Sequence, residues 1–314
     1  MEHKLEINKW LEQLDDEGKL DNSLAVLNLP DARLCTHGCP GCITKGAKVN
    51  LDEKLSSDET KQVIGYFAKH YGTKIITING RGDPFHPKLK ETTLEKIRYA
   101  AKKGIRSYVF TAGDNLDEKT CQELFKYRAN VMISLFGNKF IDAEFFEGKE
   151  YSGKDSMYAE NIRRLIESYR TSPNKTEEGI TRIGMNYVVS ENDLNDESKV
   201  RNIKEAADKN GIFLICNTDF NLHDNPEIQQ QIEKLASKYS SFNLRHSTAA
   251  GNKCRMGAAS SATVDYNGKL YKCPYMDGEG DGNFFEMKKE GKLKRILEGY
   301  LQNRDYTCVL RKTK

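Results

Sequence analysis

The sequence has no long apolar run and almost no net charge. Hydrophobic residues make up 38% of its 314 residues, yet no stretch approaches the roughly 20 apolar residues that a membrane-spanning helix needs. The formal net charge is only +3, so charge gives no argument for binding to nucleic acid or to a membrane surface. Residues 1–23 contain no apolar core of a signal peptide. We therefore expect a cytoplasmic protein that binds neither nucleic acids nor membranes.

Cysteine, in contrast, is well represented. The chain has eight cysteines, and three of them lie within the eight residues "CTHGCPGC" from Cys35 to Cys42. A reducing cytoplasm disfavours disulfides. Cysteines in such a chain are therefore expected to be metal ligands or catalytic groups.

Short β-like runs alternate with longer charged helical segments through residues 24–240. Six such pairs in succession indicate an α/β fold, and we predict a partial (β/α)6 barrel of the TIM type, with a doubly wound sheet as the alternative. In barrels the functional residues lie at the carboxyl ends of the strands. The expected strands cover residues 25–30, 74–80, 105–113, 130–137, 182–190 and 212–219, and the expected helices cover residues 57–70, 90–103, 117–127, 157–172, 196–209 and 226–239.

Two smaller parts flank this predicted barrel. Residues 1–23 are expected to form a helical extension with one apolar side, made of Leu5, Ile7, Trp10, Leu11 and Leu14. Residues 241–314 are expected to form a small separate module. In it, Asn267-Gly268 between two β-like runs indicates a hairpin, and a final helix is expected near residues 286–303.

The loop after the first predicted strand carries a C-x3-C-x2-C pattern. Three thiolates can hold three irons of a [4Fe–4S] cluster and leave the fourth iron open to another ligand. Zinc is an alternative, but it needs four ligands, and His37 is awkwardly placed to be one. A redox pair of Cys39 and Cys42 is a third alternative, which leaves Cys35 without a role.

This loop resembles the signature of the radical S-adenosylmethionine (SAM) enzymes, and the resemblance covers about residues 24–220. It implies that Cys35, Cys39 and Cys42 bind a [4Fe–4S] cluster whose open iron binds SAM. It also implies a one-electron reductant, such as a flavodoxin- or ferredoxin-like protein, and a 5′-deoxyadenosyl radical that abstracts a hydrogen atom from the substrate. The family usually has an aromatic residue before the third cysteine. This chain has Gly41 there, so adenine packing must come from elsewhere.

The segment "NGRGDPFHP" after the second predicted strand extends the resemblance. It is similar to the glycine-rich segment that binds the SAM amino group in the family, which implies this role for Gly80, Gly82, Asp83 and Pro84. Asp83 replaces the usual glutamate. Glycines allow a backbone to approach a ligand closely, and a carboxylate accepts hydrogen bonds from an ammonium group. A simple Gly-Asp-Pro turn is the alternative.

Other polar residues lie at later strand ends. The resemblance implies SAM contacts for Ser134 in the fourth predicted strand and for Asn186 in the fifth. Thr111, after the third strand, is a weaker candidate. We expect His37 and His86 to be loop histidines without a direct role.

The predicted C-terminal module contains Cys254, Cys273 and Cys308. Thirteen residues separate Cys254 from Gly268, and four separate Gly268 from Cys273. This spacing resembles the twitch and SPASM extensions of radical SAM enzymes, which implies an auxiliary [4Fe–4S] cluster with these three cysteines as ligands. The candidates for its fourth ligand are Cys216, a non-cysteine group, water and the substrate.

Cys216 lies in the sixth predicted strand, and the reaction prediction depends on it. A thiol at that strand end could donate a hydrogen atom to the substrate radical, as in some twitch-type epimerases; a buried apolar cysteine is the alternative. We therefore predict epimerisation of a sugar, cyclitol or aminoglycoside in natural-product biosynthesis. The alternatives are dehydrogenation of an alcohol carbon and radical modification of a ribosomal peptide. A non-catalytic iron–sulfur or zinc redox protein is the candidate from another class.

Overall fold

One sheet of eight strands forms the centre of the molecule. We describe it from a computed structural model at residues 3–9, 24–37, 50–79, 82–135, 143–170, 179–218, 225–239, 261–274, 276, 278 and 280–302. The strands are β2 (Val26–Asn28), β3 (Ile75–Ile78), β4 (Arg106–Thr111), β5 (Asn130–Ser134), β7 (Ile183–Val189), β8 (Phe213–Thr218), β9 (Ser261–Val264) and β10 (Leu270–Tyr271). Their order is β10-β9-β2-β3-β4-β5-β7-β8, and only the β9–β10 pair is antiparallel.

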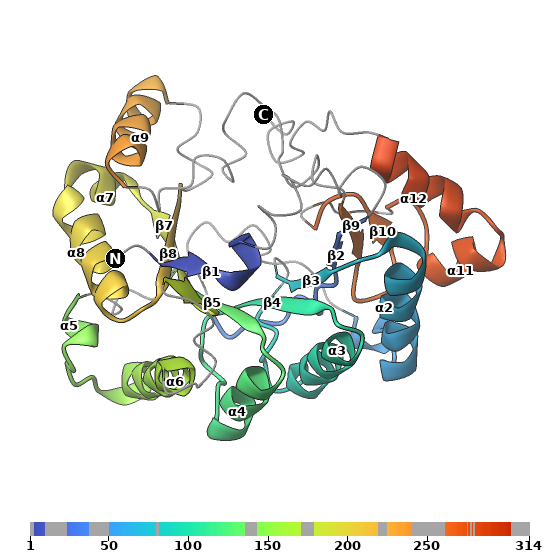
Figure 1. Ribbon diagram of the computed structural model, residues 1–314, viewed down its shortest axis with the longest axis horizontal. Helices are drawn as coiled ribbons and strands as arrows, with labels where there is room; N and C mark the ends of the chain where they lie inside the picture. Colours follow the sequence, from blue (N-terminus) through green and yellow to red (C-terminus); the bar gives the residue numbers. More distant parts are fainter. Residues whose placement is uncertain are drawn as a thin grey trace.

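Helices alternate with these strands and lie on the outside of the curved sheet (Figure 1). The longer ones are α2 (Ser57–Tyr71), α3 (Lys90–Lys102), α4 (Glu118–Lys126), α6 (Gly153–Arg170), α8 (Glu197–Lys209) and α9 (Pro226–Lys238). The shorter ones are η1 (Leu51–Glu53), α5 (Ala143–Phe146), α7 (Glu191–Asn195), α11 (Phe284–Lys289) and α12 (Leu293–Gln302). The six predicted strand–helix pairs are thus present, and the predicted α/β class with a partial barrel is confirmed. No helix in the described ranges has the length and apolar character needed to cross a bilayer.

Helix α2 shows why these segments fold as they do. Ser56 caps it by accepting a hydrogen bond from the Glu59 main-chain nitrogen, and the Glu59 carboxylate accepts one from the Ser56 nitrogen in return. The helix then buries one face against the sheet, through Thr60, Val63, Ile64, Phe67 and Tyr71.

Alternation along the strands divides the apolar side chains between two cores. The larger core lies between the sheet and the helices. The smaller one lies on the inner face of the curved sheet, with Val26, Ile75, Met132 and Ile215 as strand members. Successive side chains on a strand point to opposite faces, so every second strand residue belongs to the inner face.

The N-terminal segment fills one end of the inner core. The short strand β1 (Lys4–Leu5) pairs with β6 (Ile180–Thr181), and both Leu5 and Ile7 are fully buried in the inner core. Glu6 lies 3.6–3.8 Å from three arginines at the amino ends of β4, β5 and β7, namely Arg106, Arg128 and Arg182. The segment therefore covers the end of the barrel opposite the cysteine loop. Trp10, Leu11 and Leu14 of the predicted helix lie outside the described residues.

The predicted C-terminal hairpin is confirmed, and it extends the barrel sheet. Strand β9 pairs with β2 in parallel, with Leu27 opposite Ala262, and β10 returns beside β9. Gly268 forms the turn at φ +82°, and its nitrogen donates to the Asp265 carbonyl at 2.9 Å. The expected final helix is two helices, α11 and α12, with Gly291 at φ +72° between them. The predicted boundary at residues 240–241 lies outside the described residues and stays a prediction.

Candidate functional site

Cys35 lies in the loop that follows β2, at the carboxyl edge of the sheet. Its side chain is exposed, and its sulfur accepts a hydrogen bond from the His37 main-chain nitrogen at 3.4 Å. The other two predicted cluster ligands, Cys39 and Cys42, lie outside the described residues, as does Gly41. The structure thus places the first thiol of the pattern where a barrel carries its functional residues.

The glycine segment after β3 lies directly against this loop. A Cβ atom on Gly82 would be only 2.5 Å from the carbonyl oxygen of Leu34 and 2.7 Å from its nitrogen. The nitrogen of Asp83 donates to the same carbonyl at 2.8 Å. The two segments that the sequence assigned to the cluster and to SAM are therefore in main-chain contact, and only glycine fits at position 82. Gly80 lies outside the described residues.

The carboxylate of Asp83 is buried and satisfied by neighbouring donors. It accepts hydrogen bonds from the nitrogens of Phe85 and Ala112, both at 2.8 Å, and from the Thr111 hydroxyl at 3.0 Å. Burial raises the pKa of Asp83, although these hydrogen bonds oppose the shift. Asp83 thereby joins the end of β3 to the end of β4. The next residue, Pro84, is also buried.

Asp114, in the loop after β4, holds the cysteine loop from the other side. It accepts a hydrogen bond from the Thr36 hydroxyl at 2.7 Å and forms an ion pair with the His37 ring. The bond to Asp114 raises the pKa of His37. The His37 ring also lies 5.6 Å from the ring of Tyr158 on α6, centroid to centroid. His37 was expected to be a loop histidine without a role, and this contact was missed.

A third buried carboxylate, Asp31, follows β2 itself. It accepts hydrogen bonds from the Thr93 hydroxyl at 2.5 Å and from the Lys96 ammonium at 2.7 Å, and Asp31 and Lys96 are both only 4% exposed. Each of the strands β2, β3 and β4 is thus followed within a few residues by a buried aspartate that binds a neighbouring loop or helix. This repeated pattern, in "NLPD", "NGRGD" and "TAGD", is the signal in the sequence that could have revealed Asp31 and Asp114.

Ser134 and Asn186 lie directly opposite each other on β5 and β7. Met132, two residues before Ser134, belongs to the inner core, while Met185 and Tyr187 belong to the outer core. Alternation therefore puts both Ser134 and Asn186 on the inner face. The structure brings together the two polar residues that the sequence assigned to SAM, although it does not test that role.

The Cys216 side chain lies on the outer face of the sheet, opposite to the face that carries Ser134 and Asn186. Its neighbour Ile215 belongs to the inner core, whereas Cys216 is buried in the outer core together with Leu214. Burial raises the pKa of the Cys216 thiol to about 12, while the charge of Lys204 on α8 lowers it and that of Asp193 on α7 raises it. This position, between the sheet and the helices, argues against the predicted donation of a hydrogen atom to a substrate inside the barrel.

Cys273 follows β10 and is buried. Because β10 runs antiparallel to β9, the chain at Cys273 has returned to the level of Ser261 at the start of the hairpin. Cys254 and Cys308 lie outside the described residues. In the described ranges, no three His, Cys, Asp or Glu side chains are grouped as a metal site. The predicted auxiliary cluster is therefore not tested.

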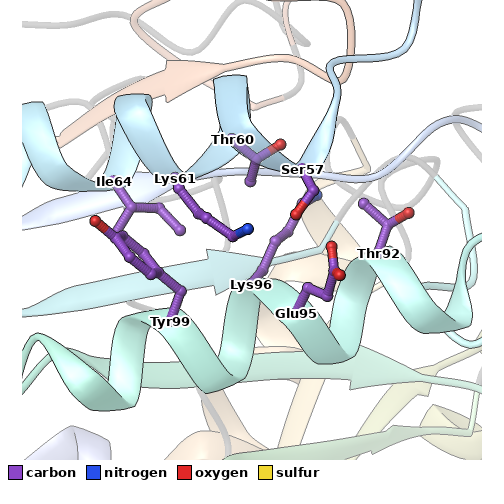
Figure 2. Close-up of a pocket in the computed structure, with 8 residues that line it drawn as sticks. All are labelled: Ser57, Thr60, Lys61, Ile64, Thr92, Glu95, Lys96 and Tyr99. Carbon is purple, nitrogen blue, oxygen red and sulfur yellow. The ribbon is translucent and has the colours of Figure 1, made fainter.

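A groove on the outer face is separate from the cysteine loop. It lies between α2 and α3 and is lined by Ser57, Thr60, Lys61, Ile64, Thr92, Glu95, Lys96 and Tyr99 (Figure 2). Figure 2 shows that these side chains come from the facing sides of the two helices. The groove is an interhelical gap on the outside of the barrel, and we give it no role in the chemistry.

The cysteine pattern fits an iron–sulfur cluster, because it offers three thiols and the first of them, Cys35, is exposed. The ring of the nearby His37 is bonded to Asp114 through its Nε2 atom. The close packing at Gly82 brings a main-chain segment, rather than another metal ligand, against the cysteine loop. Three thiols would hold three irons of a [4Fe–4S] cluster and leave the fourth iron open to a ligand that is not protein.

Solved structures with this fold confirm the predicted architecture. No protein-family model and no curated protein sequence matches the chain. Native anSMEcpe with bound AdoMet has 14% sequence identity and a TM-score of 0.57, over 92% of this chain and 86% of that one. The structure of native anSMEcpe with AdoMet and the Cp18Cys peptide has 16% sequence identity and a TM-score of 0.58, again over 92% of this chain and 86% of that one. Streptococcus suis SuiB bound to the precursor peptide SuiA has 11% identity and a TM-score of 0.58, over 97% of this chain and 76% of that one. The chain therefore has the fold of radical SAM enzymes.

Proposed function

We propose that this protein is a radical SAM enzyme. The observation that carries the proposal is the contact between Gly82 and Leu34, which joins the glycine segment to the residue before Cys35. When bound by Cys35, Cys39 and Cys42, a [4Fe–4S] cluster would supply the electron that cleaves SAM into methionine and a 5′-deoxyadenosyl radical, which removes a hydrogen atom from a substrate carbon. An external one-electron reductant would replace that electron.

The other residues near the loop would bind and orient SAM. Gly82 has no side chain, so the main chain of its segment can approach a ligand closely. Ser134 and Asn186 offer a hydroxyl and an amide from the inner face of neighbouring strands. We propose that they donate to, or accept from, the ribose and carboxylate of SAM. Asp83 would act through the loops it joins, since neighbouring donors already occupy its carboxylate.

We also propose the auxiliary cluster on Cys254, Cys273 and Cys308. The hairpin turn at Gly268 supports it, because the turn returns the chain at Cys273 toward the start of β9, which follows Cys254 in sequence. Iron analysis of a variant that lacks Cys35, Cys39 and Cys42 tests this site. Residual iron and sulfide after anaerobic reconstitution support it, and iron at the background level contradicts it.

The reaction outcome depends on how the substrate radical is quenched. Epimerisation requires a hydrogen-atom donor inside the barrel, and the outer-core position of Cys216 argues against the predicted donor. Oxidation of the substrate radical, with loss of a proton and of one electron to the auxiliary cluster, needs no such donor. A reaction in deuterated water distinguishes the two outcomes, because epimerisation without net oxidation leaves deuterium on the substrate carbon.

For the substrate we propose two alternative classes, a small polar molecule and a peptide. The acidic, glycine-rich segment of residues 275–283 favours a hydroxylated or amine-bearing small molecule such as a sugar, cyclitol or aminoglycoside. A peptide is the second proposed class. The anSMEcpe structure contains a Cp18Cys peptide, and the SuiB structure contains the precursor peptide SuiA. Formation of 5′-deoxyadenosine from SAM under anaerobic, reducing conditions tests the enzyme class, and its stimulation by either compound class tests the substrate.

A further inference from the structure

Both sides of Cys35 are tied to the neighbouring strand ends. Before it, the carbonyl of Leu34 accepts from the Asp83 nitrogen at 2.8 Å. After it, Thr36 and His37 both bond to the carboxylate of Asp114, one to each oxygen. The backbone that presents the Cys35 thiol is thus held on one side by the loop after β3 and on the other by the loop after β4.

Asp114 is itself firmly placed. Its side chain is only 4% exposed, and its main-chain carbonyl accepts a hydrogen bond from the Asn161 amide of α6 at 2.9 Å. The preceding Gly113 has φ +91°, and a Cβ atom there would be 2.9 Å from the Ile162 side chain of the same helix. These contacts hold the main chain at residues 113–114 against α6, which places the buried Asp114 carboxylate beside residues 36 and 37.

His37 is less buried than Asp114 but is held from two directions. Its Nε2 atom faces Asp114, and its ring lies against the ring of Tyr158 on α6. Its main-chain nitrogen points to the Cys35 sulfur, at 3.4 Å. A single residue thus connects the first thiol of the cluster pattern to the fixed carboxylate.

We propose that His37 and Asp114 are positioning residues for the iron–sulfur cluster, with Thr36 as the second anchor of the same carboxylate. They hold residues 35–37 in the conformation that presents the Cys35 thiol, so this first ligand is already in place when a cluster binds. The inference rests on the proposed function, since it concerns the loop that would bind the cluster. Groups that orient metal ligands in this way commonly change metal affinity about 10- to 100-fold when removed.

The test compares iron retention in matched variants of the full chain. His37→Ala removes the ring, His37→Gln keeps a side-chain donor, and Asp114→Asn removes the charge with little change of volume. His86→Ala is the matched histidine control, because within the described ranges the His86 ring accepts a single local bond, from the Lys88 nitrogen. Asp117→Asn is the matched aspartate control, since Asp117 lies in the same loop but binds Lys90 and caps α4.

Each protein is reconstituted anaerobically with iron and sulfide, and iron release to excess chelator is timed. We expect His37→Ala and Asp114→Asn to release iron about tenfold faster than the wild type, with altered electron paramagnetic resonance of the dithionite-reduced cluster. His37→Gln should recover most of the wild-type behaviour, and the two controls should match the wild type. Thermal unfolding of each apoprotein shows whether a variant is folded.

The outcomes separate the two proposals. A wild-type protein that binds no cluster overturns both this inference and the proposed function. A wild-type protein that binds a cluster, together with a folded His37→Ala variant of unchanged release rate and spectrum, overturns this inference alone. If Asp114→Asn does not fold, His37→Ala and Thr36→Val decide the question, because they change the loop and leave the buried carboxylate in place.

Discussion

The main-chain nitrogen of Asp83 donates a hydrogen bond to the carbonyl of Leu34 at 2.8 Å, beside a glycine that allows no side chain. Gly82→Ala would place a methyl group 2.5 Å from that carbonyl oxygen, and main-chain atoms cannot rotate away as a side chain can. Overpacking of this kind lowers the free energy of unfolding by about 1–3 kcal/mol. We expect this loss in urea unfolding of the apoprotein, together with weaker iron binding by the displaced loop.

Gly299→Ala is the matched control for Gly82→Ala. Gly299 lies in α12, and a Cβ atom there would face open space, with no described heavy atom within 4 Å beyond its chain neighbours and the helix backbone. Because alanine is favoured over glycine in a helix by about 1 kcal/mol, this variant should be as stable as the wild type or more so. Equal stability of both glycine variants would contradict the steric account of position 82.

The buried ion pair between Lys96 and Asp31 should matter more than any exposed pair. The Lys96 ammonium also lies 3.2 Å from the Leu29 carbonyl. Lys96→Met therefore leaves the buried Asp31 carboxylate without its counter-charge, with only the Thr93 hydroxyl as a donor that is still in place. Breaking one side of such a pair lowers the free energy of unfolding by about 3–5 kcal/mol. Urea unfolding measures this loss. The double variant Lys96→Met, Asp31→Asn should recover part of the lost stability, because it no longer buries an unpaired charge.

Lys61→Met is the control for this prediction. Lys61 pairs with Asp58, whose side chain is 86% exposed, and exposed pairs contribute only about 0–1 kcal/mol. If Lys96→Met lowered the free energy of unfolding no more than Lys61→Met did, the Lys96–Asp31 ion pair would not stabilise the start of the cysteine loop.

The Cys216 thiol should be unreactive in the native protein. Burial raises its pKa to about 12, far above pH 8, so the thiolate, which is the reactive form, is scarcely populated there. Cys121, with a pKa raised to about 11 by burial, should behave similarly. Iodoacetamide at pH 8 should therefore label the exposed Cys35 well before either of them, as peptide mass spectrometry would show.

The same residue gives a sharper test with substrate. Cys216→Ala should form the same product as the wild type, because the thiol lies in the outer core. Loss of deuterium incorporation in this variant, with 5′-deoxyadenosine formation retained, would instead restore Cys216 as the hydrogen-atom donor.

Asp117 should make the protein more sensitive to acid. Burial opposes ionisation of this group, but hydrogen bonds from Lys90 and Thr120 outweigh it and lower the pKa of Asp117 to about 2, below its ordinary value of 3.8. A lowered folded pKa stabilises the native state above pH 3.8, and this contribution disappears as the pH falls toward 2. Between pH 4 and pH 2 the urea midpoint of the wild type should therefore fall more steeply than that of Asp117→Asn. Parallel curves would contradict the assignment.

Local patterns made most of the barrel predictable. Strand β3 lies within the predicted residues 74–80, and α2 begins at the predicted residue 57, because alternation and capping are properties of neighbouring residues. The buried carboxylates of Asp31 and Asp114 were missed because their partners are distant in sequence: His37 and Asp114 are 77 positions apart. The orientation of Cys216 could not be predicted either, since "IFLIC" is apolar throughout and its pattern does not show which face of the strand is buried.

Anaerobic cleavage of SAM tests the central claim most directly. The reconstituted wild-type protein, given dithionite and SAM, should form 5′-deoxyadenosine. The Cys121→Ala variant should do the same, because Cys121 is a buried residue of α4. Cys35→Ala, Cys39→Ala and Cys42→Ala should each form none above the protein-free background. Equal 5′-deoxyadenosine formation in the wild type and Cys35→Ala, or none in the wild type with its full complement of iron, would contradict the assignment of this loop as the site of radical SAM chemistry.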